Sequence, residues 1–391
     1  MAMVHSNWKF PVESSVRFIS KFAIMILMAL GLVFFVYDVA AVQETEAKPA
    51  VKAQKSRKVI VKTAGAELRT PKKIMWKAYL GETYTTDLQK DEWLWIEEKG
   101  GWIWIENTLP FDTAIETTTQ EIEKEASAEN YHLRGVAHLA HQDPDKAIAD
   151  FNESLKKKPG VAGVLNNRGT AWYEKEDYEK ARADFSAAVK ASKTHFVAYN
   201  NRALCAIAEE KYESALTDLN AAIGMNKEYP EALNNRGVVY SRQGKFAKAI
   251  EDFSAAIKIY DRYTDALGNR SYAYRQSGNL AGAIADLETA IKLDATSYQP
   301  VNDMAWIYAT AKSKKFRNGK KAVELATKAC EMTQYLDWNA LDTLATAYAA
   351  DGDFKNANQW IATAISKAPE DKQAKLKEHQ ERFSKKKAIK N

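Results

Sequence analysis

The residues that could perform chemistry are few, and their spacing matches no catalytic arrangement. His138 and His141 lie three residues apart, which on a helix would bring two imidazoles to one face, as in some metal sites. However, His138 stands where matching positions of the chain carry aromatic residues, so we interpret it as a core residue. No Ser, His and Asp combination stands out, and residues 237–245 have the wrong spacing for a phosphate-binding loop. The sequence predicts no enzyme, no metal and no cofactor.

Composition limits the classes of function further. The 391 residues allow two or three structural units, and 46% of them are hydrophobic, enough for a large core. The net charge of +5 comes from 56 basic and 51 acidic residues, which indicates a mixed, solvated surface. Cys205 and Cys330 lie inside helical patterns without a CxxC motif, so we expect buried apolar side chains. Neither nucleic acid nor a small-molecule substrate is an expected partner.

An apolar segment near the N-terminus predicts targeting to a membrane. Residues 22–37 are almost purely apolar, and three basic residues precede them: Lys9, Arg17 and Lys21. Positive charge before such a segment favours keeping the N-terminus in the cytoplasm. The segment is either a cleaved signal peptide or an anchor within residues 18–42 that is long enough to span a bilayer. Both alternatives assign residues 1–42 to export and place the remainder in the periplasm or cell envelope, with the membrane as one partner.

A linker and a β-rich segment follow. Residues 43–57 are charged and lack large apolar side chains, so we expect a flexible linker. Residues 58–110 contain four short runs typical of strands, namely 59–62, 66–70, 93–96 and 102–106, with a Glu-Lys-Gly-Gly hairpin turn between the last two. About 50 residues in roughly five short strands predict a small β-barrel.

Three motifs in this β segment belong together. Its second run carries Ala66, Leu68 and Arg69, Gly81 stands in the middle, and Gly-Trp-Ile follows at residues 101–103. In this order the motifs resemble the bacterial SH3-like domain. The asparagine that this family usually carries before its Val-Arg pair is missing, so the resemblance implies a fold without implying ligand contacts.

Four tryptophans alternate with aliphatic residues near the end of the β segment: Trp93, Trp95, Trp102 and Trp104. Alternation along a strand places the indoles on one face and the aliphatic side chains on the other. One interpretation is that both faces pack, with Trp102 largely buried. The other is that Trp93 and Trp95 form an aromatic platform for a cell-wall glycan or a peptide.

The strongest pattern in the chain is a period of 34 residues. Arginine recurs at this spacing, each time followed by a small residue, as Arg134, Arg168, Arg202, Arg236 and Arg270. A large apolar residue recurs four positions after an alanine, as Phe151, Phe185, Leu219, Phe253 and Leu287. Small residues where helices cross, beside a large apolar residue, predict two antiparallel helices in each unit. One such unit cannot bury its own apolar face, so the units must stack.

This period and pattern resemble the tetratricopeptide repeat. We count seven units in residues 128–369, which begin near Ala128, Ala162, Phe196, Pro230, Thr264, Tyr298 and Trp338. A basic loop at residues 312–321 stretches the sixth unit, and residues 370–391 are expected to form a polar cap. The predicted fold class is mostly α: a solenoid of about seven repeats, preceded by a small SH3-like β-barrel and an N-terminal hydrophobic helix.

Two charged rows change together along the units. Five units carry Arg at position seven, counted from the start of the unit, and Asp at position twenty-three, as Asp150, Asp184, Asp218, Asp252 and Asp286. In units six and seven both charges are replaced, by Met304 and Leu325 and by Leu344 and Trp360. We infer that each Arg contacts an Asp, within a unit or between neighbours, in a partly buried seam. The alternative is two independent solvated rows.

Amides mark the expected binding surface. The resemblance implies that positions two, five, nine, twelve and thirteen line a concave, ligand-binding face. The amides at position five are Asn166, Asn200, Asn234 and Asn302, and those at position six are Asn167, Asn201, Asn235 and Asn269. The same face carries Tyr173, Arg242, Tyr272, Arg275 and Trp306. The amides either pair with an extended peptide backbone or bridge neighbouring helices without a ligand.

Together these patterns predict a non-enzymatic scaffold at the cell envelope that binds a protein or peptide on the concave face. The alternative is a cell-wall-binding protein, in which the SH3-like domain holds peptidoglycan and the repeats recruit partners.

Replacing Trp93 and Trp95 with alanine separates the two interpretations of the aromatic face. We expect the double variant to unfold the β segment, because aromatic stripes usually serve packing. Thermal unfolding followed by circular dichroism, together with co-sedimentation with purified cell wall, measures both effects. A variant that stays folded but no longer binds the wall would instead support the platform.

Overall fold

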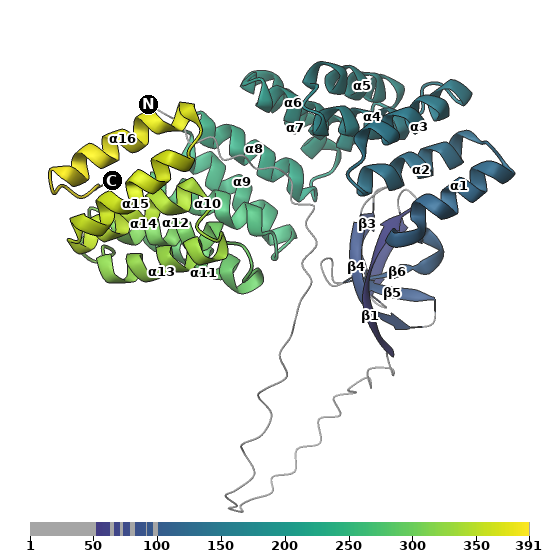
Figure 1. Ribbon diagram of the computed structural model, residues 1–391. Helices are drawn as coiled ribbons and strands as arrows, with labels where there is room; N and C mark the ends of the chain where they lie inside the picture. Colours follow the sequence, from purple (N-terminus) through teal and green to yellow (C-terminus); the bar gives the residue numbers. More distant parts are fainter. Residues whose placement is uncertain are drawn as a thin grey trace, which may run out of the picture. The chain divides into compact units, whose positions relative to one another are not determined.

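The computed structural model describes residues 52–62, 66–70, 73–78, 83–90, 92–96 and 101–390. Within them the strands come first and helices follow from residue 114 to 384 (Figure 1). The predicted export or anchor segment, residues 1–42, lies outside the described residues. None of the helices in the described ranges combines the length and the apolar character needed to cross a bilayer.

The strands form one antiparallel sheet. They are β1 (Lys52–Val61), β2 (Ala66–Thr70), β3 (Lys73–Ala78), β4 (Thr83–Lys90), β5 (Trp93–Ile96), β6 (Gly101–Trp104) and β7 (Thr108–Pro110). They pair in the order β3-β2-β6-β5-β4-β1-β7. The structure therefore shows one seven-stranded sheet in the segment where the sequence predicted a small barrel of about five strands, and the barrel itself stays a prediction.

β1 extends into the segment predicted as a flexible linker. Its main chain pairs with β4, from Lys52 opposite Gln89 to Ile60 opposite Thr83. Arg57 Nη2 also donates a hydrogen bond to Gln89 Oε1 at 2.9 Å. Main-chain pairing provides hydrogen-bond partners for the backbone N–H and C=O groups of a strand even where its side chains are polar. The linker prediction is therefore wrong for residues 52–57.

The aliphatic side chains of the sheet form its core, as the alternation predicted. Leu94, Ile96 and Ile103 are fully or almost fully buried, together with Val59, Val61 and Leu68. On the other face Trp93 is half-buried and meets Trp104 edge to face, with ring centroids 5.0 Å apart. The Arg69 guanidinium lies 5.5 Å from the Trp93 ring centroid. The side chains of Trp95 and Trp102 lie outside the described residues.

One unpredicted helix connects the sheet to the repeats. α1 (Ala114–Lys124) lies between β7 and the first helix pair. Ala114 is fully buried in a cluster with Ile60 and Leu109 of the sheet and Val136 of the first pair. The strands and the first helix pair therefore share a core.

Seven helix pairs and a final helix follow α1. The pairs are α2 (Ala128–Ala140) with α3 (Pro144–Lys157), α4 (Ala162–Glu174) with α5 (Tyr178–Ala191), α6 (Phe196–Ala208) with α7 (Tyr212–Met225), α8 (Pro230–Arg242) with α9 (Phe246–Ile259), α10 (Thr264–Gln276) with α11 (Leu280–Leu293), α12 (Gln299–Thr310) with α13 (Gly319–Met332), and α14 (Trp338–Asp351) with α15 (Phe354–Lys367). The final helix, α16 (Glu370–Ser384), occupies the segment predicted as a cap. Six of the seven pairs begin at the predicted residue, and the sixth begins one residue later, so the predicted solenoid is confirmed.

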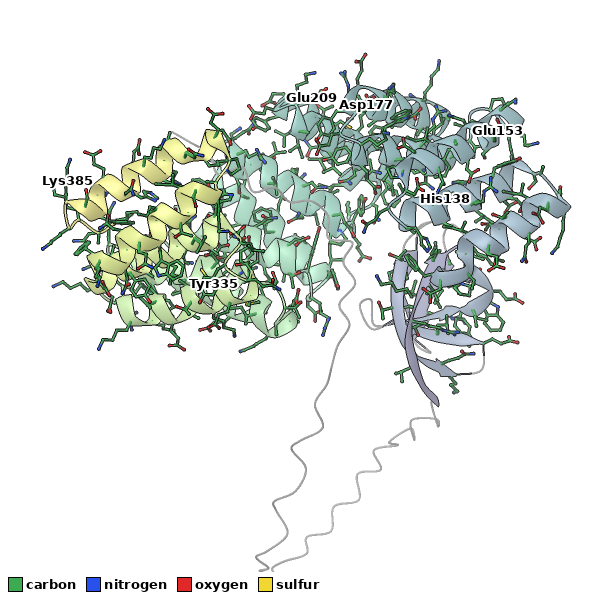
Figure 2. The ribbon with its side chains drawn as sticks, viewed as in Figure 1. His138, Glu153, Asp177, Glu209, Tyr335 and Lys385 are labelled. Atoms are coloured by element: carbon green, nitrogen blue, oxygen red, sulfur yellow. The ribbon has the colours of Figure 1, made fainter. Side chains whose placement is uncertain are left out.

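Local sequence explains where the second helices begin. Asp177, labelled in Figure 2, accepts a hydrogen bond from the Lys180 backbone amide and so caps α5. Asp143, Asn279, Asn318 and Asp353 cap α3, α11, α13 and α15 in the same way. Short polar side chains at this position satisfy amides that the helix leaves unpaired.

A close approach between the two helices of a pair fixes their spacing. A Cβ atom added to Gly169 of α4 would lie 2.7 Å from the Phe185 ring of α5. Gly135 and Gly237 face Phe151 and Phe253 at similarly short distances. Among the first five units, the two with a larger residue at this position carry leucine in place of phenylalanine, as Ala203 with Leu219 and Ser271 with Leu287. The volumes at the crossing therefore compensate each other.

We expect Gly169→Ala to destabilise the protein by about 1–3 kcal/mol, because the added methyl overlaps the Phe185 ring. Combining it with Phe185→Leu recreates the pair found at Ala203 and Leu219 and should recover part of that loss. The free energy of unfolding, measured with denaturant for both single variants and the double variant, tests this coupling. Strictly additive losses would contradict the proposed contact.

Candidate functional site

The predicted contact between the Arg and Asp rows is confirmed, and it lies within each unit. Arg202 donates from Nε and Nη2 to the two carboxylate oxygens of Asp218, at 2.8 and 2.6 Å. The other four pairs have the same bidentate geometry at 2.6–2.8 Å, in units one, two, four and five. The Asp218 side chain is 7% exposed and that of Arg202 is 25% exposed. Hydrogen bonding to Asp218 raises the pKa of Arg202 above its usual value.

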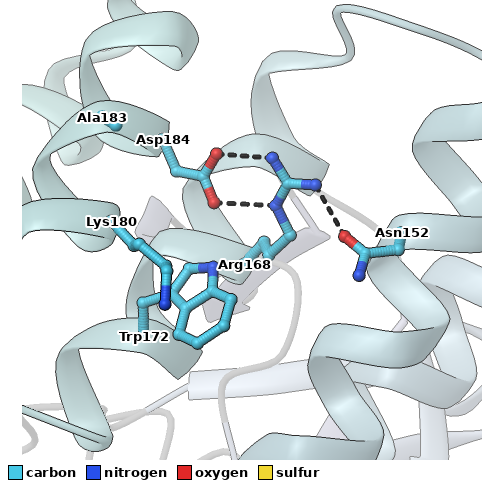
Figure 3. Close-up of a pocket in the computed structure, with 6 residues that line it drawn as sticks. All are labelled: Asn152, Arg168, Trp172, Lys180, Ala183 and Asp184. Atoms are coloured by element: carbon cyan, nitrogen blue, oxygen red, sulfur yellow. Dashed lines mark hydrogen bonds and ion pairs between the residues drawn. The ribbon is translucent and has the colours of Figure 1, made fainter. Parts of the chain in front are cut away.

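The third nitrogen of each guanidinium reaches the preceding element, which the sequence did not reveal. Arg168 Nη1 donates to Asn152 Oδ1 of the preceding unit at 2.7 Å (Figure 3). Arg236 and Arg270 reach Asn220 and Ser254 in the same way, at 2.8 and 2.9 Å. In units two to five each arginine thus joins both helices of its own unit to the second helix of the unit before, and Arg134 of unit one reaches Thr119 of α1 instead.

The pocket in Figure 3 is part of this seam. It has a volume of about 270 Å³ and is lined by Asn152, Arg168, Trp172, Lys180, Ala183 and Asp184. The Lys180 ammonium lies 4.3 Å from the Trp172 ring centroid and also pairs with Asp177. Its charged groups are therefore paired with one another, which is typical of a structural contact between units.

The asparagines form bridges between neighbouring units. The position-six amide of one unit donates to the position-five amide oxygen of the unit before: Asn201 to Asn166 at 3.1 Å, Asn235 to Asn200 at 2.9 Å, and Asn269 to Asn234 at 3.0 Å. The position-five asparagines are buried, with 2–6% exposure. At the start of the row, the amide of Asn167 meets His132 Nε2 at 3.1 Å. This arrangement is the inter-helix bridge that the sequence left as one of two alternatives.

The row of bridges is interrupted between units five and six. Gly268 stands at position five of unit five, and no atom lies within 4 Å of the place where its Cβ would be. The facing residue is the half-buried Asp303, whose carboxylate accepts a hydrogen bond from Gln299 Nε2 at 3.1 Å. Burial raises the pKa of Asp303, while the nearby charge of Arg275 and the hydrogen bond from Gln299 act in the opposite direction.

At the end of the array a different pair replaces the amides. Asp342, at position five of unit seven, lies 2.8 Å from His379 Nδ1 of α16, and both side chains are buried. Asn302 Oδ1 in unit six has no hydrogen-bond partner among the described residues, because unit seven carries Thr343 at the facing position. The Thr343 hydroxyl instead donates to the Asn339 carbonyl oxygen.

The exposed part of the predicted binding face lies in units four to six. Tyr272 is 42% exposed, and the Arg275 guanidinium lies 5.5 Å from its ring centroid. Arg242 and Trp306 are half-buried. No ion pair or side-chain hydrogen bond joins Arg242 to another of the described residues. The exposed Tyr272 and the half-buried Arg242, Arg275 and Trp306 therefore offer cationic and aromatic surface on this face.

The cysteines and histidines considered as candidates for chemistry are buried or packed against other side chains. Burial raises the pKa of both Cys205 and Cys330 to about 12, so both thiols are protonated at neutral pH. His138 is buried and burial lowers its pKa, while the His141 ring stacks on Phe111 with centroids 4.0 Å apart. No group of three or more His, Cys, Asp or Glu side chains within the described ranges could hold a metal ion.

Comparison with protein families identifies the repeats. Sequence models of the tetratricopeptide repeat match residues 132–195, 230–263 and 264–297, and a further model of the same repeat matches residues 207–244. The chain contains tetratricopeptide repeats. A search of curated proteins gave no match.

One solved structure shares part of the fold at low sequence identity, and further solved structures match more weakly. The crystal structure of the APC/C hetero-tetramer Cut9–Hcn1 is 15% identical with a TM-score of 0.55, over 61% of this chain and 46% of that chain. The present chain therefore spans less than half the length of that relative. A tetratricopeptide repeat protein from Parabacteroides merdae is 16% identical over 69% of this chain and 99% of its own, with a TM-score of 0.45. YrrB, described as a TPR protein with an unusual peptide-binding site, is 21% identical over 49% of this chain and 98% of its own, with a TM-score of 0.38.

We expect Asp218→Ala to cost about 3 kcal/mol of unfolding free energy, because it leaves the Arg202 guanidinium without its carboxylate in a partly buried seam. Even a surface ion pair contributes only roughly 0–1 kcal/mol. The control is therefore Glu179→Ala, which removes an exposed acidic side chain that forms no ion pair with another of the described residues.

The double variant Arg202→Met/Asp218→Leu copies the apolar residues of unit six, where Met304 and Leu325 pack in one cluster. It should be less destabilised than Asp218→Ala, because no charge is left unpaired. Equal unfolding free energies for Asp218→Ala and the Glu179 control, measured by denaturant titration, would show that the seam does not contribute to stability.

Proposed function

We propose that the protein is a non-enzymatic scaffold at the cell envelope that binds a protein or peptide along the concave face of its tetratricopeptide repeats. The observation that carries this proposal is the partly exposed set Arg242, Tyr272, Arg275 and Trp306. Arg242 has no ion-pair partner among the described residues, and Arg275 lies beside the exposed Tyr272 ring. Such side chains provide the charged and apolar contacts typical of protein interaction sites.

The asparagines contribute to this site in a different way from the exposed side chains. Asn200 and Asn234 are buried, and their amide oxygens already accept hydrogen bonds from the next unit. A peptide that used them would first have to displace these bridges. We therefore assign the first contacts to the exposed arginines and aromatic rings, and the predicted pairing of the amides with a peptide backbone stays a prediction.

The carboxylates near these side chains determine where an acidic group of the ligand could bind. Asp303 lies close enough to Arg275 for the arginine charge to act on the carboxylate, whereas no carboxylate of the described residues forms an ion pair with Arg242. Arg242 is consequently the site for an acidic group of the ligand, and Tyr272 with Trp306 is the site for an apolar side chain. The partner that we propose is a protein segment carrying an acidic residue near an apolar one.

The envelope location rests on the sequence of the N-terminal segment, whose apolar run and preceding basic residues are typical of export or anchoring. We also propose that the strands form an SH3-like domain, on the motifs at residues 66–69 and 101–103. The alternative function, peptidoglycan binding by that domain, is favoured by one observation, the half-buried indole of Trp93 beneath Arg69.

A crosslinking pull-down from native envelope with the full chain would identify the partner. We expect Arg242→Ala/Tyr272→Ala to weaken capture of that partner roughly tenfold or more, because exposed Arg and Tyr residues at the centre of an interface contribute most of its affinity. Affinity is then measured by titration of the purified partner.

The matched control is Arg262→Ala, an exposed arginine in the turn before α10. It should bind like the wild-type protein. Undiminished affinity of a folded Arg242→Ala/Tyr272→Ala variant would exclude this face as the binding site.

A further inference from the structure

Two segments of the chain concentrate basic residues without acidic ones. Residues 312–321 contain six basic residues and residues 382–390 contain five, and neither segment has an Asp or Glu. The first is the loop that stretches unit six, and the second follows the exposed end of the capping helix. Neither belongs to the concave face proposed above.

The structure brings the two segments to the C-terminal part of the array. The turn after α12 lies against the end of α14, since a Cβ added to Gly319 would be 2.6 Å from the Asp351 Cα. The chain after α16 buries Ile389 in the core cluster that units six and seven and α16 share. Both segments therefore adjoin the same core cluster. We call the basic edge the set Lys312, Lys314, Lys315, Arg317, Lys320, Arg382, Lys385, Lys386, Lys387 and Lys390.

The charges of the basic edge are exposed and mostly unpaired. Lys312, Lys314, Lys315 and Lys320 are exposed, and no acidic side chain of the described residues pairs with them. Lys385, which Figure 2 shows at the outer end of α16, is the one member with an ion pair, to Glu381. Most of the positive charge is therefore available to a partner.

The equivalent turns of the first three units carry more acidic than basic residues. Residues 141–146, 175–180 and 209–214 together contain eight acidic and four basic residues. Their lysines form ion pairs, such as Lys180 with Asp177 and Lys211 with Glu209. The turn of unit seven likewise carries Asp351 and Asp353 beside Lys355. The excess of positive charge is therefore confined to the two segments themselves, and it is not a general property of the turns.

We propose that the basic edge binds the anionic phospholipid headgroups of a bilayer surface. Nine of the eleven basic residues in the two segments are lysines, whose ammonium groups need no fixed geometry and suit a diffuse negative surface. Phe316 lies among the lysines of the first segment, with the Lys315 ammonium 5.4 Å from its ring centroid. An aromatic ring among lysines is typical of segments that lie at a membrane interface.

The N-terminal segment favours a membrane surface, and not another anionic partner, as the ligand of the basic edge. The apolar run at residues 22–37 is the part of the sequence that predicts membrane targeting, and such an anchor would hold the folded units close to headgroups. The inference therefore rests on the proposed envelope location. It does not depend on the concave face, so the two can fail separately.

Vesicle co-flotation of the full chain tests the proposal. The protein is reconstituted in nanodiscs of phosphatidylcholine and mixed with vesicles that contain either phosphatidylcholine alone or added phosphatidylglycerol. We expect flotation with the anionic vesicles only, and loss of that flotation at high salt, because screening weakens contacts between exposed charges.

The test variant changes six lysines of the basic edge to glutamine: Lys312, Lys314, Lys315, Lys385, Lys386 and Lys387. The control changes six exposed lysines elsewhere on the repeats: Lys158, Lys190, Lys193, Lys227, Lys258 and Lys292. Both lose the same charge, and circular dichroism verifies that both remain folded. We expect flotation to fall roughly tenfold in the test variant alone. Equal flotation of the two variants, or equal flotation of the wild type with neutral and anionic vesicles, would overturn the proposal.

Discussion

Each helix pair leaves part of its apolar face uncovered, and the next pair covers it. Ala203 and Leu219 of unit three share a buried cluster with Ala232 and Val239 of unit four. The stack is therefore held by burial that crosses unit boundaries. Every other contact of the array has to be compatible with that register, and the polar contacts lie where they fix it.

The polar contacts operate on two sides of the stack. In the seam, a guanidinium such as that of Arg168 holds the two helices of its own unit through Asp184 and reaches the preceding unit through its third nitrogen. On the amide row, an asparagine of one unit donates to an asparagine of the unit before. Directional hydrogen bonds on both sides fix the relative orientation of neighbouring units, which apolar packing alone specifies poorly. This explains why a buried carboxylate such as that of Asp218 is tolerated in a helical core.

Much of this architecture could be predicted from the sequence, because the repeat itself carries the information. The joint loss of charge at Met304 and Leu325 predicted the Arg–Asp contact, and the structure places those two residues in one apolar cluster. The third hydrogen bond of the arginines was not predictable, because its acceptors alternate between residues such as Asn152 and Ser254 and show no constant type.

Segments outside the repeat were harder to predict. β3 and β4 lack the alternation of β5 and β6, and the polar start of β1 is ordered by main-chain pairing that a side-chain pattern does not record. α1 has no counterpart in the 34-residue period, so counting repeats did not reveal it. Inside this helix Thr118 is buried, and its hydroxyl donates a hydrogen bond to the Ala114 carbonyl oxygen. The exposed face of Arg242 and Tyr272 was predicted by helical geometry, whereas the burial of the asparagines beside it depends on the approach of the next unit.

The end of the array shows how these constraints determine which surface is left for a partner. In unit seven, Asp342 and Thr346 at positions five and nine are buried, and His379 of α16 lies on Asp342. His379 also lies close to Trp306, with ring centroids 6.1 Å apart. A helix that closes the apolar core must therefore also cover the last part of the concave face. The accessible cationic and aromatic side chains of that face, such as Arg242 and Tyr272, consequently lie in the units before the cap. The row of amide bridges is interrupted in the same part of the array, at Gly268.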